Sequence, residues 1–185
     1  MIGFYVLLGL LVAALIGAIS IYNRLVRNRQ MVQEGWSGID VQLKRRADLI
    51  PNLIEAVKGY MGHEKGVLEK VTELRAQSLK AGGVGDKARV EGALGAALGN
   101  LLAVAENYPD LKASQNFIQL QQSLADIEDQ IQLSRRYYNG AARNLNILVA
   151  SFPSNLVANM FQFTPAEYFE IEDAGDRAVP KVAFP

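Results

Sequence analysis

The chain has 185 residues, half of them hydrophobic, with no cysteine, one histidine and a formal net charge of zero. This length and composition suit a single domain with one hydrophobic core. The lack of cysteine excludes disulfides, thiolate nucleophiles and sulfur-ligated metal sites, and a single histidine leaves little for a catalytic triad.

Charge is distributed unevenly along the chain. Arg24, Arg27 and Arg29 are the only charged side chains before Glu34, so the rest of the chain is mildly acidic. Binding to nucleic acid rests largely on lysine and arginine side chains that neutralise phosphates. We therefore do not expect nucleic acid among the partners of this protein.

Residues 1–22 form an uncharged, strongly apolar stretch that we predict to be a transmembrane anchor. As an α-helix it would reach roughly 33 Å, which is enough to span a bilayer. Tyr5 and Tyr22 lie near its two ends, where amphipathic rings favour the headgroup region. A cleaved secretory signal is the alternative, and the small residues between Ala14 and Ala18 would permit cleavage. Because no basic side chain precedes the apolar run, we favour a retained anchor.

Three arginines just after the span predict its orientation. Positive charge is retained on the cytoplasmic side, so Arg24, Arg27 and Arg29 would place the following domain in the cytoplasm and Met1 outside. These side chains would also meet the anionic headgroups of the bilayer, at about 1 kcal/mol each. We predict that residues 23–34, which contain them, form a basic juxtamembrane helix.

Small residues recur at every fourth position within the span, at Gly9, Ala13 and Gly17. This spacing places them on one helix face, where a second transmembrane helix could approach closely. Glycine and alanine are also common in membrane helices generally. The pattern is therefore compatible with self-association without requiring it.

After the span, apolar residues recur at three- and four-residue spacing, which predicts an antiparallel four-helix bundle over residues 35–155. The first stripe contains Trp36, Ile39, Leu43, Ile50, Leu53, Val57 and Tyr60. Gly35 and Gly38 leave two alternatives open. Either the anchor helix runs straight into this one, or Ser37 and Asp40 cap a new helix.

Proline and glycine residues set the predicted limits of the next helices. Pro51 should kink the first helix, and Gly62 should end it before a turn at His63. The second helix is predicted over 63–80, a loop over 81–86 and a third helix over 87–107. Their predicted inward residues are Val67, Val71, Leu74 and Ser78, then Val90, Leu94, Leu98, Leu101 and Ala105.

The fourth helix has the most regular pattern, which holds for about five heptads and is typical of a four-helix bundle or coiled coil. Its stripe is Phe117, Leu120, Leu124, Ile127, Ile131, Ser134, Tyr138, Ala141, Leu145, Leu148 and Phe152, and Pro153 ends it.

Residues 156–185 are predicted to be a C-terminal extension rich in aromatic and acidic residues. We expect a short helix over 154–160 and extended chain after it. The aromatic side chains are Phe161, Phe163, Tyr168 and Phe169, and the acidic ones are Glu167, Glu170, Glu172, Asp173 and Asp176, before Pro180 and Pro185. The rings should pack on the bundle or on a neighbouring copy, and burial against another subunit is a hypothesis.

A polar cluster lies around Pro51 and contains Arg45, Arg46, Asp48 and Asn52. Arg46 falls on the apolar stripe, so its charge must be paired. Antiparallel packing could supply Asp126, Glu128 or Asp129 from the fourth helix. One interpretation is a catalytic or ligand site. The favoured one is a buried ion pair that sets the register of the bundle.

A second polar cluster is interpreted in the same way, with a structural role favoured, and contains Arg135, Arg136, Tyr137, Tyr138 and Asn139. Glu55, Glu64 and Glu128 raise the question of a carboxylate-bridged metal centre. That centre needs an acid three residues before a histidine, and Tyr60 occupies the position before His63. We therefore predict no catalytic residue, no cofactor and no metal site.

Several motifs together resemble the LemA family. They are Tyr22-Asn23, Gly35-Trp36, Val41 to Arg46, Asp48 to Leu53, Val57 to Tyr60, His63-Glu64, Tyr108 to Ala113, Arg135 to Asn139, Phe152-Pro153 and Tyr168 to Glu170. The resemblance covers nearly the whole chain. It implies a bacterial inner-membrane protein with an N-terminal anchor, a helical bundle and no established enzymatic activity. Relatives linked to building magnetosome membranes further imply a role in membrane organisation. The glycine-rich stretch from Gly82 to Gly99 departs from the family pattern.

These observations predict a non-enzymatic membrane scaffold that forms homo-oligomers, with bundles packed side by side on one membrane face. A single-copy adaptor of another membrane protein is the alternative. An enzyme is the least favoured of the three, because the residue inventory offers so few catalytic groups.

Overall fold

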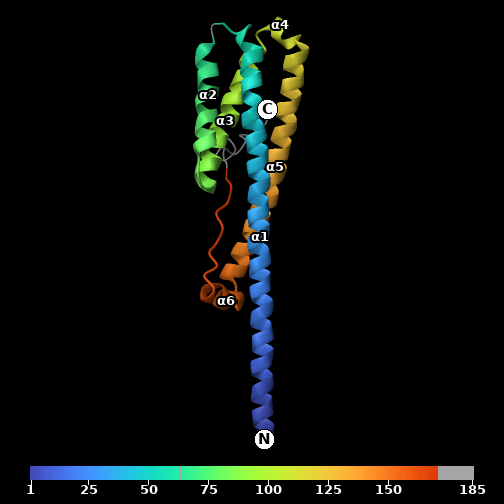
Figure 1. The fold of residues 1–185 in the computed structure, drawn as a ribbon, viewed down its shortest axis with the longest axis vertical. Helices are drawn as coiled ribbons and strands as arrows, with labels where there is room; N and C mark the ends of the chain where they lie inside the picture. Colours follow the sequence, from blue (N-terminus) through green and yellow to red (C-terminus); the bar gives the residue numbers. More distant parts are fainter. Residues whose placement is uncertain (63, 171–185) are drawn as a thin grey trace, which may run out of the picture. The chain divides into compact units, whose positions relative to one another are not determined.

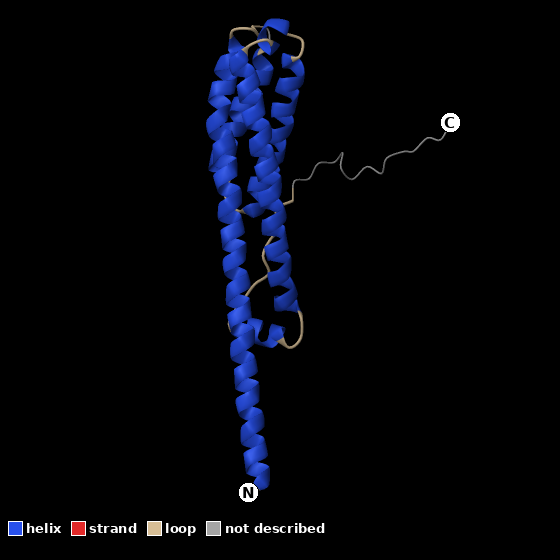
Figure 2. Cartoon of the chain, turned by 90° about the vertical axis from the view of Figure 1, so that its right-hand side faces the viewer, coloured by secondary structure: helices blue, strands red, loops and turns tan. Residues whose placement is uncertain are grey.

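The structure is a computed structural model that describes residues 1–62 and 64–170 (Figures 1 and 2). It confirms the predicted all-α class, with a long apolar N-terminal helix packed against further helices. Its elements are α1 (Ile2–Lys58), α2 (Lys65–Lys80), α3 (Val84–Ala105), α4 (Pro109–Lys112), α5 (Gln115–Ala150) and α6 (Ser154–Met160). The predicted turn at His63 and the acidic and proline residues after Glu170 lie outside the described residues.

Helix α1 is continuous through the two glycines where a break was an alternative. Ser37 does not cap a new helix, because its hydroxyl donates to the Gln33 carbonyl one turn earlier, at 3.1 Å. Pro51 also lies inside the helix, which continues to Lys58. In the two helical turns after this proline, Leu53 and Val57 are buried in the core, and this packing stabilises the end of α1.

The chain forms two compact units, and α1 and α5 contribute to both. The first comprises Met1–Asp40 and Gln132–Tyr168. Its core contains Leu25 of α1, Leu145 of α5, Ala158 of α6 and Phe163. The second comprises Val41–Ile131 together with Phe169 and Glu170.

The core of the second unit contains the stripes predicted from the spacing of apolar residues. Its buried members are Ile50, Leu53, Val57, Met61, Val71, Leu74, Leu94, Leu98, Leu101, Ala105, Leu111, Phe117, Leu120 and Leu124. Two stripe residues, Tyr60 and Phe152, were predicted wrongly and are exposed. Each lies two residues beyond the end of its helix, at Lys58 and Ala150, where the helical spacing no longer applies.

The loop predicted over 81–86 is shorter than expected. Helix α3 begins at Val84, three residues before the predicted start, and Gly83 has a φ of 81°, a conformation that favours glycine. Asp86 lies in the first turn, where its negative charge interacts favourably with the helix dipole. An additional short helix, α4, occupies the predicted turn at Pro109.

The C-terminal extension contains the predicted short helix, α6. The hypothesis that its rings are buried by another subunit is wrong for Phe163 and Phe169, because both are buried within this chain. Phe163 completes the core of the first unit, whereas Phe161 and Tyr168 are exposed.

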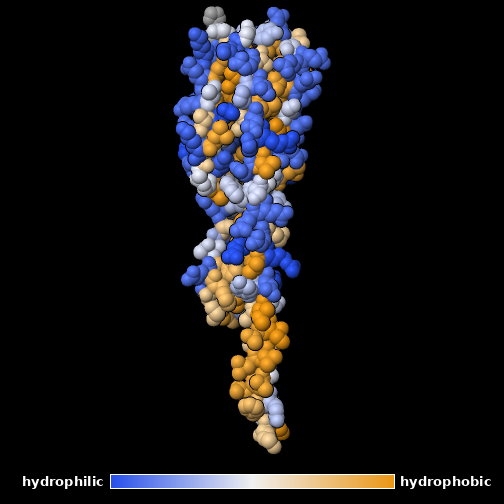
Figure 3. Space-filling model, viewed as in Figure 1, coloured by the Kyte–Doolittle hydropathy of each residue, from blue (hydrophilic) through white to orange (hydrophobic). Residues whose placement is uncertain are grey.

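Within the part of the chain that the structure describes, two helices are long and apolar enough to cross a membrane, α1 and α3. The apolar window of α1 has no buried residue, and Figure 3 shows this N-terminal segment as predominantly hydrophobic. Helix α3 instead contributes Leu94, Leu98 and Leu101 to the core. The N-terminal segment of α1 is therefore the segment suited to a lipid environment.

Candidate functional site

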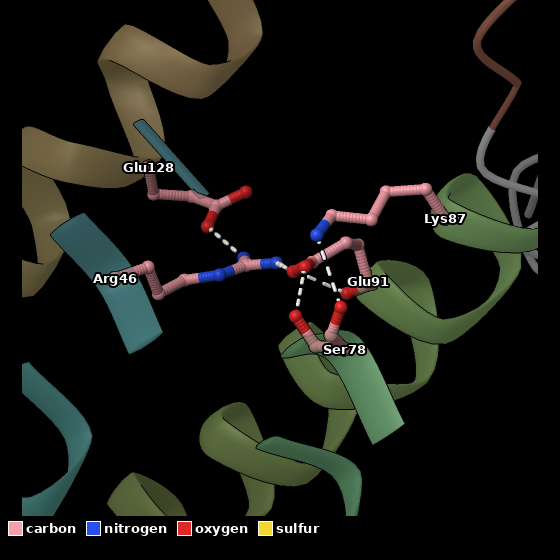
Figure 4. Close-up of polar contacts among 5 residues, drawn as sticks. All are labelled: Arg46, Ser78, Lys87, Glu91 and Glu128. Carbon is pink, nitrogen blue, oxygen red and sulfur yellow. Dashed lines mark hydrogen bonds and ion pairs between the residues drawn. The ribbon is translucent and has the colours of Figure 1, made fainter. Parts of the chain in front are cut away.

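The candidate site is a buried polar network around Arg46 in the second unit (Figure 4). Arg46 lies on α1 one helical turn from each of the core residues Leu43 and Ile50, and only 2% of its surface is exposed. Since the helical spacing fixes this side chain on the core face, its charge has to be compensated inside the protein.

Two carboxylates from different helices compensate that charge. Nη1 donates to Oε2 of Glu128 on α5 at 2.6 Å. Nη2 donates to Oε2 of Glu91 on α3 at 2.5 Å and to the Glu91 backbone carbonyl at 3.2 Å. Glu91 is 1% exposed, whereas the side chain of Glu128 is partly open to solvent. The predicted pairing of Arg46 with an acid of the fourth predicted helix, which is α5 in the structure, is confirmed. That acid is Glu128.

Helix α2 completes the network. The Ser78 hydroxyl donates to the second carboxylate oxygen of Glu91, so both oxygens accept hydrogen bonds. Lys87 of α3 donates to the Ser78 carbonyl at 3.0 Å and so links α3 to the end of α2 (Figure 4). Residues from α1, α2, α3 and α5 thus meet at one buried point, and a change in register of any of these helices would break at least one contact.

This arrangement suits a structural role better than catalysis. A general base needs a free carboxylate oxygen within reach of a substrate proton, but both oxygens of Glu91 accept bonds from protein donors. Among residues 1–62 and 64–170, no group of three or more acidic, histidine or cysteine side chains could hold a metal ion. Arginine forms the buried pair well, since its planar fork can serve two acids at once.

The other three residues of the predicted cluster do not join this network. Arg45 is exposed and donates to Gln42 at 3.2 Å. Asp48 is exposed and pairs with Lys44 at 2.9 Å, and Asn52 is also exposed. Each residue along a helix is rotated by about 100° from the one before it, so residues close to Arg46 in the sequence can face in other directions. These three side chains therefore lie on the solvent side of α1.

The sequence prediction missed Glu91. The residue lies on α3 with Leu94, Leu98 and Leu101 at three- and four-residue spacing, so it interrupts a core stripe as Arg46 does. Two stripes, each interrupted by one charge of opposite sign, were the signal that could have revealed the pair. The prediction assigned this position of the stripe to Val90, which has a four-residue spacing to Leu94 and is also buried, and therefore overlooked Glu91.

Arg135 and Arg136 lie in the first unit and line a separate surface hollow of about 390 Å³. The other residues around it are Gln132, Asn139, Gly140, Arg143 and Tyr168. Three of the residues that line the hollow are arginines, and none of the lining residues is acidic.

Tyrosines 137 and 138 connect α5 to other parts of the first unit. The Tyr138 hydroxyl donates to the Glu167 carbonyl at 2.8 Å, and its ring centroid lies 5.9 Å from that of Trp36. Burial and the nearby Glu167 raise the pKa of Tyr138. Desolvation, followed by the charge and hydrogen bond of Glu34, raises the pKa of Tyr137. Both hydroxyls are therefore donors at neutral pH.

The residues predicted to lie at the membrane interface occupy the N-terminal part of the first unit. The Tyr22 ring centroid lies 4.7 Å from that of Phe161 and 5.9 Å from that of Phe163. The Arg29 guanidinium lies 4.9 Å from the centre of the Phe163 ring. Arg24, Arg27 and Tyr5 are exposed, as are Gly9, Ala13 and Gly17 on their common face.

An apolar groove of about 700 Å³ lies in the second unit between the end of α1 and helix α2. Its lining residues are Ile54, Lys58, Met61, Gly62, Lys65, Leu68, Glu69, Thr72 and Glu73. The lining combines apolar side chains with a few charged ones, which is the composition of a site for an apolar group from a partner.

Comparison with known proteins agrees with this architecture. The chain is 29% identical to "Magnetosome protein MamQ 2" of Paramagnetospirillum magneticum over 85% of this chain and 68% of that protein. It is 27% identical to "Magnetosome protein MamQ" of Magnetospirillum gryphiswaldense, with the same coverage. It is 28% identical to "Protein LemA" of Metamycoplasma hominis over 82% of this chain and 69% of that protein. The LemA family model matches residues 35–184, most of the chain. The chain belongs to the LemA family.

Proposed function

We propose that this protein is a non-enzymatic, membrane-anchored scaffold that self-assembles in the bacterial inner membrane and organises it. The observation that carries the proposal is the uninterrupted course of α1. Its first turns are apolar and exposed, while Leu25 and Ile39 of the same helix are completely buried. One helix thus combines a segment suited to lipid with a segment that builds the protein core.

A rigid connection is what a geometric scaffold requires. The core of Leu25, Leu145, Ala158 and Phe163 fixes α1 against α5 and α6 directly beyond the span. The direction in which the anchor enters the bilayer then determines the direction of the attached helices. Contacts repeated between copies would fix the angle between neighbouring anchors, and with it the local shape of the membrane.

Family membership supports a membrane role of this kind. Two of the relatives are named magnetosome proteins, from two different bacteria. An association with a membrane agrees with these names and with the apolar segment of α1. Arg24, Arg27 and Arg29 support a cytoplasmic location of the helices behind the anchor, since basic residues remain on that side.

The face formed by Gly9, Ala13 and Gly17 is the proposed contact between anchors. Apart from the adjacent turns of α1 itself, an added Cβ at Gly9 or Gly17 would meet no described residue within 4 Å, so this face is open to another helix. Small residues permit close backbone approach in a membrane, where packing rather than the hydrophobic effect drives association.

Particle mass tests the proposal. The full chain is purified in detergent, and its mass is measured by size-exclusion chromatography with light scattering and by electron microscopy after transfer to lipid. We expect particles that contain several chains. Ala13→Ile should reduce their mass, because its side chain separates the backbones. The matched Ala14→Ile, displaced by about 100° around the helix, should not. A monomeric parent protein would refute the scaffold.

The apolar groove between α1 and α2 favours a second candidate, a single-copy adaptor of another membrane protein. Ile54 and Leu68, which are partly exposed, offer a surface for an apolar side chain of that partner. The adaptor predicts a particle with one copy of this chain and one of the partner. It also predicts that Leu68→Lys separates the two without unfolding α2.

A further inference from the structure

The apolar surface of α6 and its flanking turns has no role in the functions considered so far. Phe152 and Met160 are 79% and 77% exposed, and Leu156 and Phe161 are also exposed. We call these four residues the α6 apolar surface. The opposite side of α6 buries Ala158 and Ser154 against the first unit. A soluble surface rarely gathers so many large apolar side chains without a partner.

The position of this surface indicates its partner. Phe161 contacts Tyr22 at the end of the predicted span, with ring centroids 4.7 Å apart. Helix α6 lies beside α1 in both views, where the exposed apolar segment of α1 ends (Figures 1 and 2). Figure 3 shows hydrophobic residues of the α6 region adjoining the hydrophobic N-terminal segment. The two apolar surfaces are therefore continuous.

The distribution of charged residues around α6 also favours the lipid membrane as the partner of this surface. No charged residue lies between Arg143 and Glu167, although this stretch includes the exposed end of α5 and all of α6. The Arg29 guanidinium lies 4.9 Å from the centre of the ring of Phe163, three residues after α6. Large apolar side chains, aromatic rings and adjacent arginine are typical of segments that lie in the membrane interface.

We propose that the α6 apolar surface inserts into the membrane interface on the same side as Tyr22 and forms a second, non-spanning membrane contact. The proposal rests on the anchoring of α1 in lipid. A single spanning helix leaves its protein free to rotate about the helix axis and to tilt. A second contact beside the span removes part of that freedom, because Phe152 and Met160 would leave lipid when the protein tilts away.

Nitroxide accessibility in lipid vesicles tests this contact, and the absence of cysteine allows single labels without other changes. Labels are introduced by Leu156→Cys and Met160→Cys in the full chain. Leu133→Cys is the matched control, because Leu133 is an exposed leucine on α5 roughly 26 Å of helix before Ala150. Leu11→Cys reports on the anchor itself. Relaxation by oxygen, which partitions into lipid, is compared with relaxation by a water-soluble nickel chelate.

The expected result is a ratio of oxygen to nickel accessibility severalfold higher at Leu156 and Met160 than at Leu133. A high ratio at Leu11 with equal ratios at Leu133, Leu156 and Met160 would overturn the second contact while anchoring stands. A low ratio at Leu11 would overturn both. Exclusion of both reagents at Leu156 and Met160, with dipolar broadening between labels, would show that a second copy covers this surface and would also overturn the proposal.

Discussion

The Arg46 guanidinium and the Glu91 carboxylate form an ion pair 2.5 Å apart, and both side chains are almost completely excluded from water. Taking two charges out of water costs several kcal/mol for each ion, which the pair recovers only while both partners are present. The network therefore penalises loss of one partner more than loss of both.

Arg46→Met should destabilise the protein by about 3–5 kcal/mol, because the substitution keeps an apolar stem and leaves Glu91 buried without its cation. The free energy of unfolding is measured with urea, by circular dichroism of the full chain in detergent. Arg45→Met is the matched control. It removes the adjacent, exposed arginine and should change stability by no more than about 0.5 kcal/mol.

The double variant Arg46→Met, Glu91→Leu distinguishes a structural role of this ion pair from a chemical one. It should recover most of the stability lost in the single variant, since no buried charge remains unpaired on α3. If this folded variant also assembles as the parent does, the network is structural. A folded, stable double variant that has lost its cellular function would instead establish a chemical role for the pair.

Gly35 and Gly38 should respond in opposite directions to substitution by alanine. A Cβ at Gly35 would lie 3.0 Å from the Tyr138 Cα and 3.1 Å from Tyr137 Cδ1, so Gly35→Ala should cost about 1–3 kcal/mol. A Cβ at Gly38 would meet nothing within 4 Å, so Gly38→Ala should stabilise the helix by about 1 kcal/mol. Thermal unfolding of the two variants checks the prediction. Equal effects of the same sign would show that α1 and α5 do not approach each other closely at Gly35.

Tyr138 should make stability depend on pH in the alkaline range. Its pKa is raised above the ordinary 10.0, so the folded state favours the protonated phenol. The stabilisation is complete below pH 10 and is lost as the pH rises through the raised pKa. In Tyr138→Phe, the loss of unfolding free energy above pH 10 should be smaller than in the parent. At neutral pH the same variant should lose about 0.5–1.5 kcal/mol with the hydrogen bond to Glu167. Tyr60→Phe, which alters an exposed ring, controls for the loss of a hydroxyl.

The orientation of the anchor can be read with single cysteines and a membrane-impermeant maleimide. In intact cells Ile2→Cys should react and Glu55→Cys should not, and after lysis both should react. Replacing Arg24, Arg27 and Arg29 by glutamine should yield a mixed population, because these charges are the predicted topological signal. Reaction of Glu55→Cys in intact cells would place the second unit outside the cytoplasm.

Most of the fold could be predicted from the sequence because it depends on local periodicity. Residues such as Leu94, Leu98 and Leu101 follow a helical spacing, so their burial requires no knowledge of the other helices. The same spacing failed at Tyr60 and Phe152, where the helix had already ended. Caps and ends depend on a few local hydrogen bonds, which are harder to infer than a stripe.

The candidate site was predictable only in part. Arg46 interrupts an apolar stripe, so its need for a partner was clear from α1 alone. The choice among Asp126, Glu128 and Asp129 depends on the register between two helices that are distant in the sequence. The pairing of Arg46 with Glu91 depends in addition on the position of α3. The burial of Phe163 and Phe169 within the chain depends on where the segment after α6 folds back. Such long-range relationships leave no periodic signal.

The uninterrupted course of α1 from Ile2 to Lys58 has a consequence for its insertions and deletions. Since each residue turns the helix by about 100°, one extra residue between Tyr22 and Leu25 would rotate every lipid-facing side chain relative to every core-facing one. Seven extra residues would add almost two whole turns and nearly restore the original phase. The length of this segment therefore sets an angle as well as a distance, and only steps of about seven residues change the distance while nearly keeping the angle.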